Sequence, residues 1–162
     1  MVLEYIKENF DTNIPSPTVE DIAKIIKTDE TGTELDDVSK INEKLLKATL
    51  SVKFEPKYLC ALREIEDEIG EGKPVIVWVW LSDDRGGGCG HSVVITDINR
   101  LEGVIGYNDP IFGEREEEIG TFMSRWDNIN INRILIKVKI EKRPQRLIPE
   151  YAERKVEEES SS

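Results

Sequence analysis

The chain is poor in the residues that build disulfide frameworks, metal sites and membrane spans. Among its 162 residues there are two cysteines and one histidine, and Cys60 and Cys89 form no Cys-x-x-Cys pair. So few cysteines indicate free thiols and a reducing, cytoplasmic location. No apolar run approaches the roughly 20 residues that cross a bilayer, and Met1 opens an acidic amphipathic segment rather than a signal peptide. We therefore expect a soluble protein with no segment inserted in a membrane.

Positive charge is scarce as well. Lys and Arg total 22 against 33 Asp and Glu, which leaves a net charge of −11. A surface of this sign repels phosphate backbones and anionic lipid headgroups, so nucleic acid is excluded as an expected partner. Hydrophobic residues still make up 38% of the chain, enough at this length for one compact core. Nothing in the composition indicates an oligomeric state.

Apolar residues recur at helical spacing through the N-terminal part, which predicts short helices packed together. One helix has Val19 and Ile22 on its expected buried face. A short strand is expected over residues 51–54, ahead of a further helix that contains Cys60. The expected helix starts are the capping pairs Thr18/Asp21 and Thr33/Asp36, and Pro56.

The pattern changes to strands from residue 75 onward. Residues 75–81 are all apolar and predict a central strand covered on both faces, with Trp78 and Trp80 in the core. The further expected elements are a glycine-rich loop over 83–90, a hairpin of strands 91–98 and 104–107, a helix carrying Phe122 and Trp126, and an edge strand over 134–140. This order predicts an α+β fold, with N-terminal helices packed on a C-terminal antiparallel sheet.

The domain organisation follows from where the apolar periodicity stops. We expect one domain over residues 1–140 and a polar, mobile tail over residues 141–162, which has no apolar face to bury.

His91, the one histidine, stands where the glycine-rich loop meets a strand, a position at which functional groups are often presented. In an antiparallel hairpin the end of the second strand lies near the start of the first, so Asp109 can reach the His91 ring. A carboxylate there fixes the imidazole tautomer and stabilises the imidazolium. The spacing alone also fits a surface histidine beside a turn carboxylate, and it does not decide between the two.

Three ordered motifs resemble a known family. They are Gly72-Lys73-Pro74 before the buried strand, Gly90-His91 at the next strand, and Asn108-Asp109-Pro110 after the hairpin. Their order and spacing resemble the papain-like cysteine peptidases related to bacteriocin-processing, double-glycine leader peptidases. The resemblance implies a papain-like fold, peptide-bond hydrolysis, His91 as general base, Asp109 as the orienting carboxylate, a peptide or protein substrate, and no cofactor.

The family's nucleophile has no counterpart in the sequence. The resemblance aligns Met1-Val2-Leu3-Glu4-Tyr5 with residues that follow a Cys-Gly-Pro-type motif, so the catalytic cysteine would fall about two helical turns before residue 1. The family's oxyanion glutamine would be missing too. We therefore expect the chain to be inactive, because it lacks the segment that carries the catalytic cysteine. Three explanations are open: the start of the chain is misassigned, an upstream segment has been lost, or the domain is a natural pseudo-enzyme.

Other residues offer weaker chemistry. Cys89 shares a strand face with His91 if the strand begins at Gly88, but no oxyanion site accompanies it as a substitute nucleophile. Cys60 is interpreted as structural. We expect no metal site, because Cys89, His91 and Asp109 lack a fourth donor. The glycine loop lacks the Lys-Ser or Lys-Thr end of a phosphate loop, and the acidic run 114–118 is interpreted as a solvated helix start.

Three hypotheses remain from the sequence. The first is a cysteine-peptidase-like domain whose full-length form hydrolyses peptides. The second is a pseudo-peptidase that binds a peptide or leader without cutting it. The third is an acidic interaction domain with no pocket function.

Overall fold

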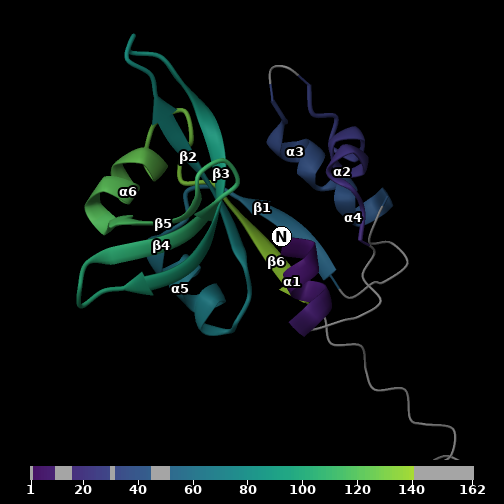
Figure 1. Cartoon of the computed structure of the whole chain (residues 1–162), viewed down its shortest axis with the longest axis horizontal. Coiled ribbons are helices and arrows are strands. Elements are labelled where there is room, and N and C mark those ends of the chain that lie inside the picture. The colour runs from purple at the N-terminus through teal and green to yellow at the C-terminus, as the bar shows by residue number, and fades with distance from the viewer. Residues whose placement is uncertain (1, 10–15, 30–31, 45–51, 141–162) are drawn as a thin grey trace, which may run out of the picture.

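The fold is a six-stranded antiparallel sheet with helices on both sides, in the strand order β1-β6-β2-β3-β4-β5 (Figure 1). The computed structural model describes residues 2–9, 16–29, 32–44 and 52–140, so the predicted tail over 141–162 lies outside the described residues. The helices are α1 Val2–Asn9, α2 Val19–Ile25, α3 Leu35–Val38, α4 Lys40–Lys44, α5 Leu62–Gly70 and α6 Ile119–Trp126. The strands are β1 Val52–Lys57, β2 Val75–Ser82, β3 Gly88–Asn99, β4 Val104–Asp109, β5 Gly113–Glu118 and β6 Leu135–Ile140. The α+β prediction is confirmed.

The N-terminal helices match the sequence in their first cap and differ after it. The Thr18 hydroxyl accepts the Asp21 N–H at 3.1 Å, and the Thr18 N–H donates to the Asp21 carboxylate at 3.2 Å, which is the predicted capping box. Val19 was predicted to be buried, but it is 79% exposed. The cap predicted at Thr33 is wrong, because its hydroxyl bonds the Thr28 hydroxyl and Glu34 is the N-cap residue of α3.

The edge of the sheet beside these helices also differs from expectation. Pro56 does not open a helix but lies within β1, opposite Ile136 of β6. An edge strand tolerates proline, because one side of its backbone needs no N–H donor. The next helix, α5, begins at Leu62. Strand β6 was predicted to close the sheet but lies inside it, between β1 and β2.

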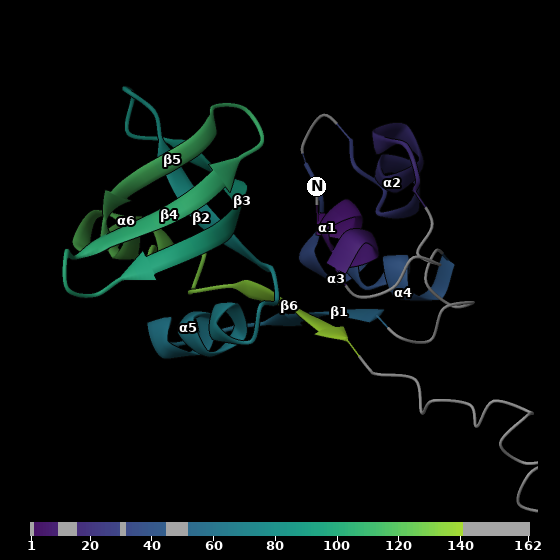
Figure 2. The same cartoon turned by 60° about the horizontal axis from the view of Figure 1, so that its bottom comes forward.

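Strand register defines two faces of the sheet. Residues paired across antiparallel strands share a face. We call the side that carries Val77 and Val93 the α6 face, because Phe122 of α6 packs there against Tyr107 of β4. The side that carries Ile76, Val94 and Asn108 is the α1 face. The N-terminal helices border the α1 face at one end, and Figure 2 shows β4 and β5 with α6 behind them and no helix in front.

The core lies between the sheet and α6. Val77 and Val79 of β2 are fully buried, and so are Phe122 and Trp126 of α6. The Trp126 indole N–H donates to the Ile134 carbonyl at 2.8 Å, which satisfies the one polar atom of that side chain. Trp78 and Trp80 were predicted in the core. They lie half-buried on the α1 face and pack against the buried core residues.

The acidic run 114–118 is strand β5 rather than the predicted helix start. Gly113, with a φ of 78°, pairs with Asp109 and closes a tight turn that brings the run back along β4. Pairing with β4 thus overrides the helical preference of the glutamates. No helix among the described residues is long and apolar enough to cross a membrane.

The core assignment predicts the cost of truncating an aromatic side chain. Phe122→Ala leaves a cavity at a fully buried site and should lower the free energy of unfolding by about 3–5 kcal/mol in urea denaturation. Phe112→Ala, at a side chain that is 57% exposed, is the matched control and should cost less than about 1 kcal/mol. Equal losses would show that α6 does not anchor the core.

Candidate active site

The hairpin of β3 and β4 brings the histidine and the aspartate together. His91 stands near the start of β3 opposite Val79, and Asp109 ends β4. Both side chains lie on the α6 face, where the His91 Nε2 atom is 2.9 Å from the Asp109 Oδ2 atom. Their exposed fractions are only 10% and 6%, so water competes little for this contact.

The turn after β4 holds the Asp109 carboxylate in place. Its Oδ1 atom accepts the N–H groups of Ile111 at 2.8 Å and Phe112 at 3.1 Å. An aspartate that bonds the backbone two residues on forms an Asx turn, and Pro110 suits the position between them. One carboxylate oxygen is therefore committed to the turn, and the other is left for the imidazole.

These contacts favour the ionised form of Asp109 and set the tautomer of His91. Burial raises the pKa of Asp109, but the N–H donors of Ile111 and Phe112 and the His91 ring together lower that pKa below its ordinary value. An ionised carboxylate accepts the hydrogen bond, which assigns the proton of neutral His91 to Nε2. The Nδ1 atom then carries the lone pair, and it bonds no residue in the part of the chain that the structure describes. His91 is thus arranged to take a proton at Nδ1.

Glycines before His91 let a tryptophan lie against the hairpin. Gly86, with a φ of 79°, makes the turn between β2 and β3. A Cβ atom on Gly88 would lie 2.3 Å from the Leu81 carbonyl oxygen and 2.7 Å from the Trp80 indole. The glycine-rich segment is therefore a structural device that packs the Trp80 ring on the strand leading to His91, which the sequence did not indicate.

Helix α6 packs against β4 close to the dyad of His91 and Asp109. Tyr107, two residues before Asp109, packs against Phe122 with ring centroids 6.4 Å apart. The Arg125 guanidinium donates to the Tyr107 hydroxyl at 3.3 Å and forms an ion pair with Glu117. Leu81, Tyr107, Asp109, Phe112 and Arg125 line part of a hollow of about 300 Å³ beside these groups.

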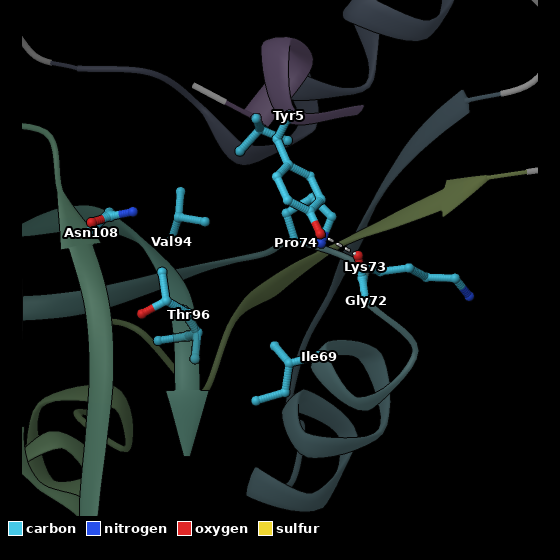
Figure 3. A pocket seen from close by; sticks show the side chains of 10 residues that line it. Tyr5, Ile69, Gly72, Lys73, Pro74, Val94, Thr96 and Asn108 are labelled. Carbon is cyan, nitrogen blue, oxygen red and sulfur yellow. Dashed lines mark hydrogen bonds between the residues drawn. The ribbon is translucent and has the colours of Figure 1, made fainter. Parts of the chain in front are cut away.

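Two further cavities lie on the opposite, α1 face of the same strands. One of about 260 Å³ is bounded by Val2 and Tyr5 of α1 and by Val94 and Asn108 of the sheet (Figure 3). The Tyr5 hydroxyl donates to the Gly72 carbonyl at 2.9 Å, which ties α1 to the turn of the Gly-Lys-Pro motif. Thus the first motif anchors α1, and the other two carry the dyad.

The second of these cavities, about 440 Å³, lies between the N-terminal helices and the sheet. Val2 borders both cavities, and Ser92, next to His91, borders the larger one. The lining of this larger cavity is mostly apolar and includes Ile22, Phe54 and Trp78. Sequence reasoning did not find this cavity, because its walls come from segments far apart in the chain.

The two cysteines have different surroundings. Cys60 is 2% exposed, in the loop before α5 rather than on the predicted helix. Burial, with the nearby Glu64 carboxylate, raises the pKa of its thiol to about 11, so little thiolate forms at neutral pH. Cys89 is exposed on β3, which begins at Gly88, so it shares the strand side of His91. The described residues contain no group of three or more His, Cys, Asp or Glu arranged to hold a metal ion.

The locked carboxylate predicts a pH-dependent stability difference. Asp109→Asn should lower the free energy of unfolding at pH 7 by about 1–3 kcal/mol. The reason is that the Ile111 N–H and the His91 ring would then face a neutral amide instead of a buried carboxylate. The folded-state pKa of Asp109 is lowered, so its stabilisation is complete above the unfolded-state pKa and disappears as pH falls through the folded value. Urea denaturation should show the difference shrinking below about pH 4. Asp84→Asn, in an exposed loop, is the control and should show neither effect.

The packing of Trp80 on Gly88 is tested by adding one methyl group. Gly88→Ala should lower the free energy of unfolding by about 1–3 kcal/mol, because its Cβ atom meets backbone as well as indole. Gly120→Ala, where a Cβ atom meets nothing within 4 Å, should be neutral or stabilise helix α6 by up to about 1 kcal/mol. A thermal melt of both variants distinguishes them, and equal melting temperatures would contradict the close approach at Gly88.

Comparison with known proteins gives the fold a precedent. No protein-family model matches the sequence, and no curated protein matches it. Among solved structures, the chain is similar to the peptidase domain of Streptococcus ComA, a bi-functional ABC transporter involved in a quorum-sensing pathway. The TM-score is 0.57 at 16% sequence identity, with 86% of this chain and 88% of that chain covered. At this identity the likeness establishes the fold, so the chain has the fold of a peptidase domain.

Proposed function

We propose that the chain is a cysteine-peptidase-like domain in which His91 is the general base and Asp109 is its orienting carboxylate. The observation that carries the proposal is the 2.9 Å contact between His91 Nε2 and a buried carboxylate whose other oxygen is held by two backbone N–H groups. Histidine paired in this way is a recurring arrangement for activating a nucleophile. The peptidase-domain fold supports the same interpretation.

The proposed reaction uses the free Nδ1 atom. His91 takes the proton of a cysteine thiol at Nδ1, and the thiolate attacks the carbonyl carbon of a peptide bond. The imidazolium then gives that proton to the leaving amine as the carbon–nitrogen bond breaks, which leaves a thioester. Water, deprotonated by the same imidazole, hydrolyses the thioester and restores the thiol. Throughout, Asp109 stabilises the positive charge on the ring.

In this proposal neither cysteine of the 162 residues supplies the thiol. Cys60 is buried with a pKa raised to about 11, and Cys89 lies on the same strand as the base, in a segment with no evident oxyanion donors. The 162-residue chain alone is inactive in this proposal.

A second candidate function is peptide binding without cleavage. The observation that favours it is the mostly apolar cavity of about 440 Å³ between the N-terminal helices and the sheet, which has room for side chains of a bound peptide. In this alternative, His91 and Asp109 stabilise the hairpin and carry out no chemistry.

Peptidase assays on two forms of the protein test the proposal. A fluorogenic peptide with a Gly-Gly cleavage site should not be cut by the 162-residue chain. It should be cut by a full-length form, meaning here a form extended before residue 1 by a segment that carries a cysteine. In the full-length protein, His91→Ala should lower kcat/KM by at least about 100-fold, because proton transfer by a positioned base contributes about that much. Asp84→Asn, exposed in the turn between β2 and β3, should leave kcat/KM unchanged.

Thiol alkylation separates the two candidate functions. If His91 activates an upstream cysteine, iodoacetamide should modify that cysteine faster than it does in the His91→Ala variant at pH 6. The peptidase proposal fails if the full-length protein cuts no peptide and its alkylation rates are the same with and without His91. Peptide binding that survives His91→Ala, in the absence of cleavage, would support the binding module. In the 162-residue chain, alkylation of Cys89 should not depend on His91.

A further inference from the structure

Strand β5 has an unpaired outer edge. It is the last strand in the sheet order, and its six residues pair with β4 alone among the described elements. An edge strand presents backbone N–H and C=O groups that a further strand can pair with. The opposite edge, β1, contains Pro56, which removes one of its donors. Thus β5 is the sheet edge better suited to accept another extended chain.

Acidic side chains gather on one face of this edge. Glu114, Glu116 and Glu118 alternate along β5 and therefore point to the same side. The register places Glu114 opposite Asn108 and Glu116 opposite Gly106, so that side is the α1 face. Asp97 of β3 lies opposite Gly106 from its other side. Asp97 and Glu116 thus flank a residue with no side chain, on the part of the sheet that no helix covers in Figure 2.

The carboxylates on the two faces of β5 differ in whether they have an ion-pair partner. Glu117, which points to the α6 face, forms an ion pair with Arg125. In contrast, the side chains of Asp97, Glu114, Glu116 and Glu118 form no hydrogen bond or ion pair with another described residue, and all four residues are exposed. Four uncompensated carboxylates on one face repel one another, and a cationic partner would relieve that repulsion.

We propose that the outer edge of β5 binds an extended, cationic peptide segment of another protein as an added strand. Along a strand, alternate side chains repeat about every 6.6 Å, so basic residues at every second position of the peptide match the three glutamates. Directly opposite residues on paired strands have Cβ atoms about 4.5–5.5 Å apart, within reach of a lysine or arginine head group. The net charge of −11 attracts such a peptide from a distance.

A second copy of this chain does not fit the same edge. Pairing two β5 strands would bring glutamates against glutamates, and like charges directly opposite one another destabilise a strand pair. The acidic row therefore prevents edge-to-edge association of identical chains while it leaves the edge open to a basic one. The proposal goes beyond the peptidase assignment and does not depend on it, since it uses neither His91 nor a nucleophile.

A short capped peptide in which lysine alternates with threonine is the probe. Its affinity for the 162-residue chain, measured by fluorescence anisotropy at low salt, should fall about 10-fold in the triple variant Glu114→Gln, Glu116→Gln, Glu118→Gln, because exposed ion pairs each contribute a small amount. The matched control changes the net charge equally with Glu8→Gln, Glu20→Gln and Glu43→Gln, exposed on α1, α2 and α4. This control should change the affinity less than about 2-fold.

Variants of the probe test the strand geometry. A peptide with the same composition but with its lysines grouped together should bind more weakly, and so should one N-methylated at alternate backbone amides, which cannot complete the pairing. The probe is tested on the 162-residue chain and needs no cleavage, so failure of the peptidase proposal would not affect this one. The proposal is overturned if the alternating peptide does not bind, if the N-methylated peptide binds equally well, or if both triple variants weaken binding to the same degree.

Discussion

The candidate site depends on the different hydrogen-bond partners of the two oxygens of the Asp109 carboxylate. One oxygen accepts two backbone N–H groups of the turn after β4, and the other accepts the His91 ring. Because the turn holds the carboxylate ionised and in a fixed orientation, it fixes the imidazole tautomer as well. A histidine with its Nδ1 lone pair available is the result.

The two faces of the sheet differ in burial and in how their charges are compensated. On its α6 face, Phe122 and Arg125 hold Tyr107 and hence the end of β4, and charges are compensated internally. On its α1 face there are cavities beside α1 and exposed carboxylates along β5. The contact between His91 and Asp109 thus lies on the buried, charge-compensated face, and the exposed carboxylates of β5 lie on the other.

Several local features were predictable because they depend on neighbours in sequence. The capping box of Thr18 and the β3–β4 hairpin that joins His91 to Asp109 follow from short-range spacing, and both are present. Predictions that required knowledge of packing partners failed. Pro56 is in a strand because β6 lies beside it, and the run 114–118 is a strand because β4 pairs with it. Propensity is weaker than such pairing.

The sequence by itself determined the fold class, the candidate residues His91 and Asp109, and the surplus of negative charge, because periodicity, motif spacing and composition are properties of the linear chain. Only the tertiary structure decided which face of the sheet each group occupies, how Gly88 makes room for Trp80, and where cavities open. These depend on strand register and on the order of strands in the sheet. A shift of one residue would move every side chain of β5 to the other face, so no local pattern could specify them.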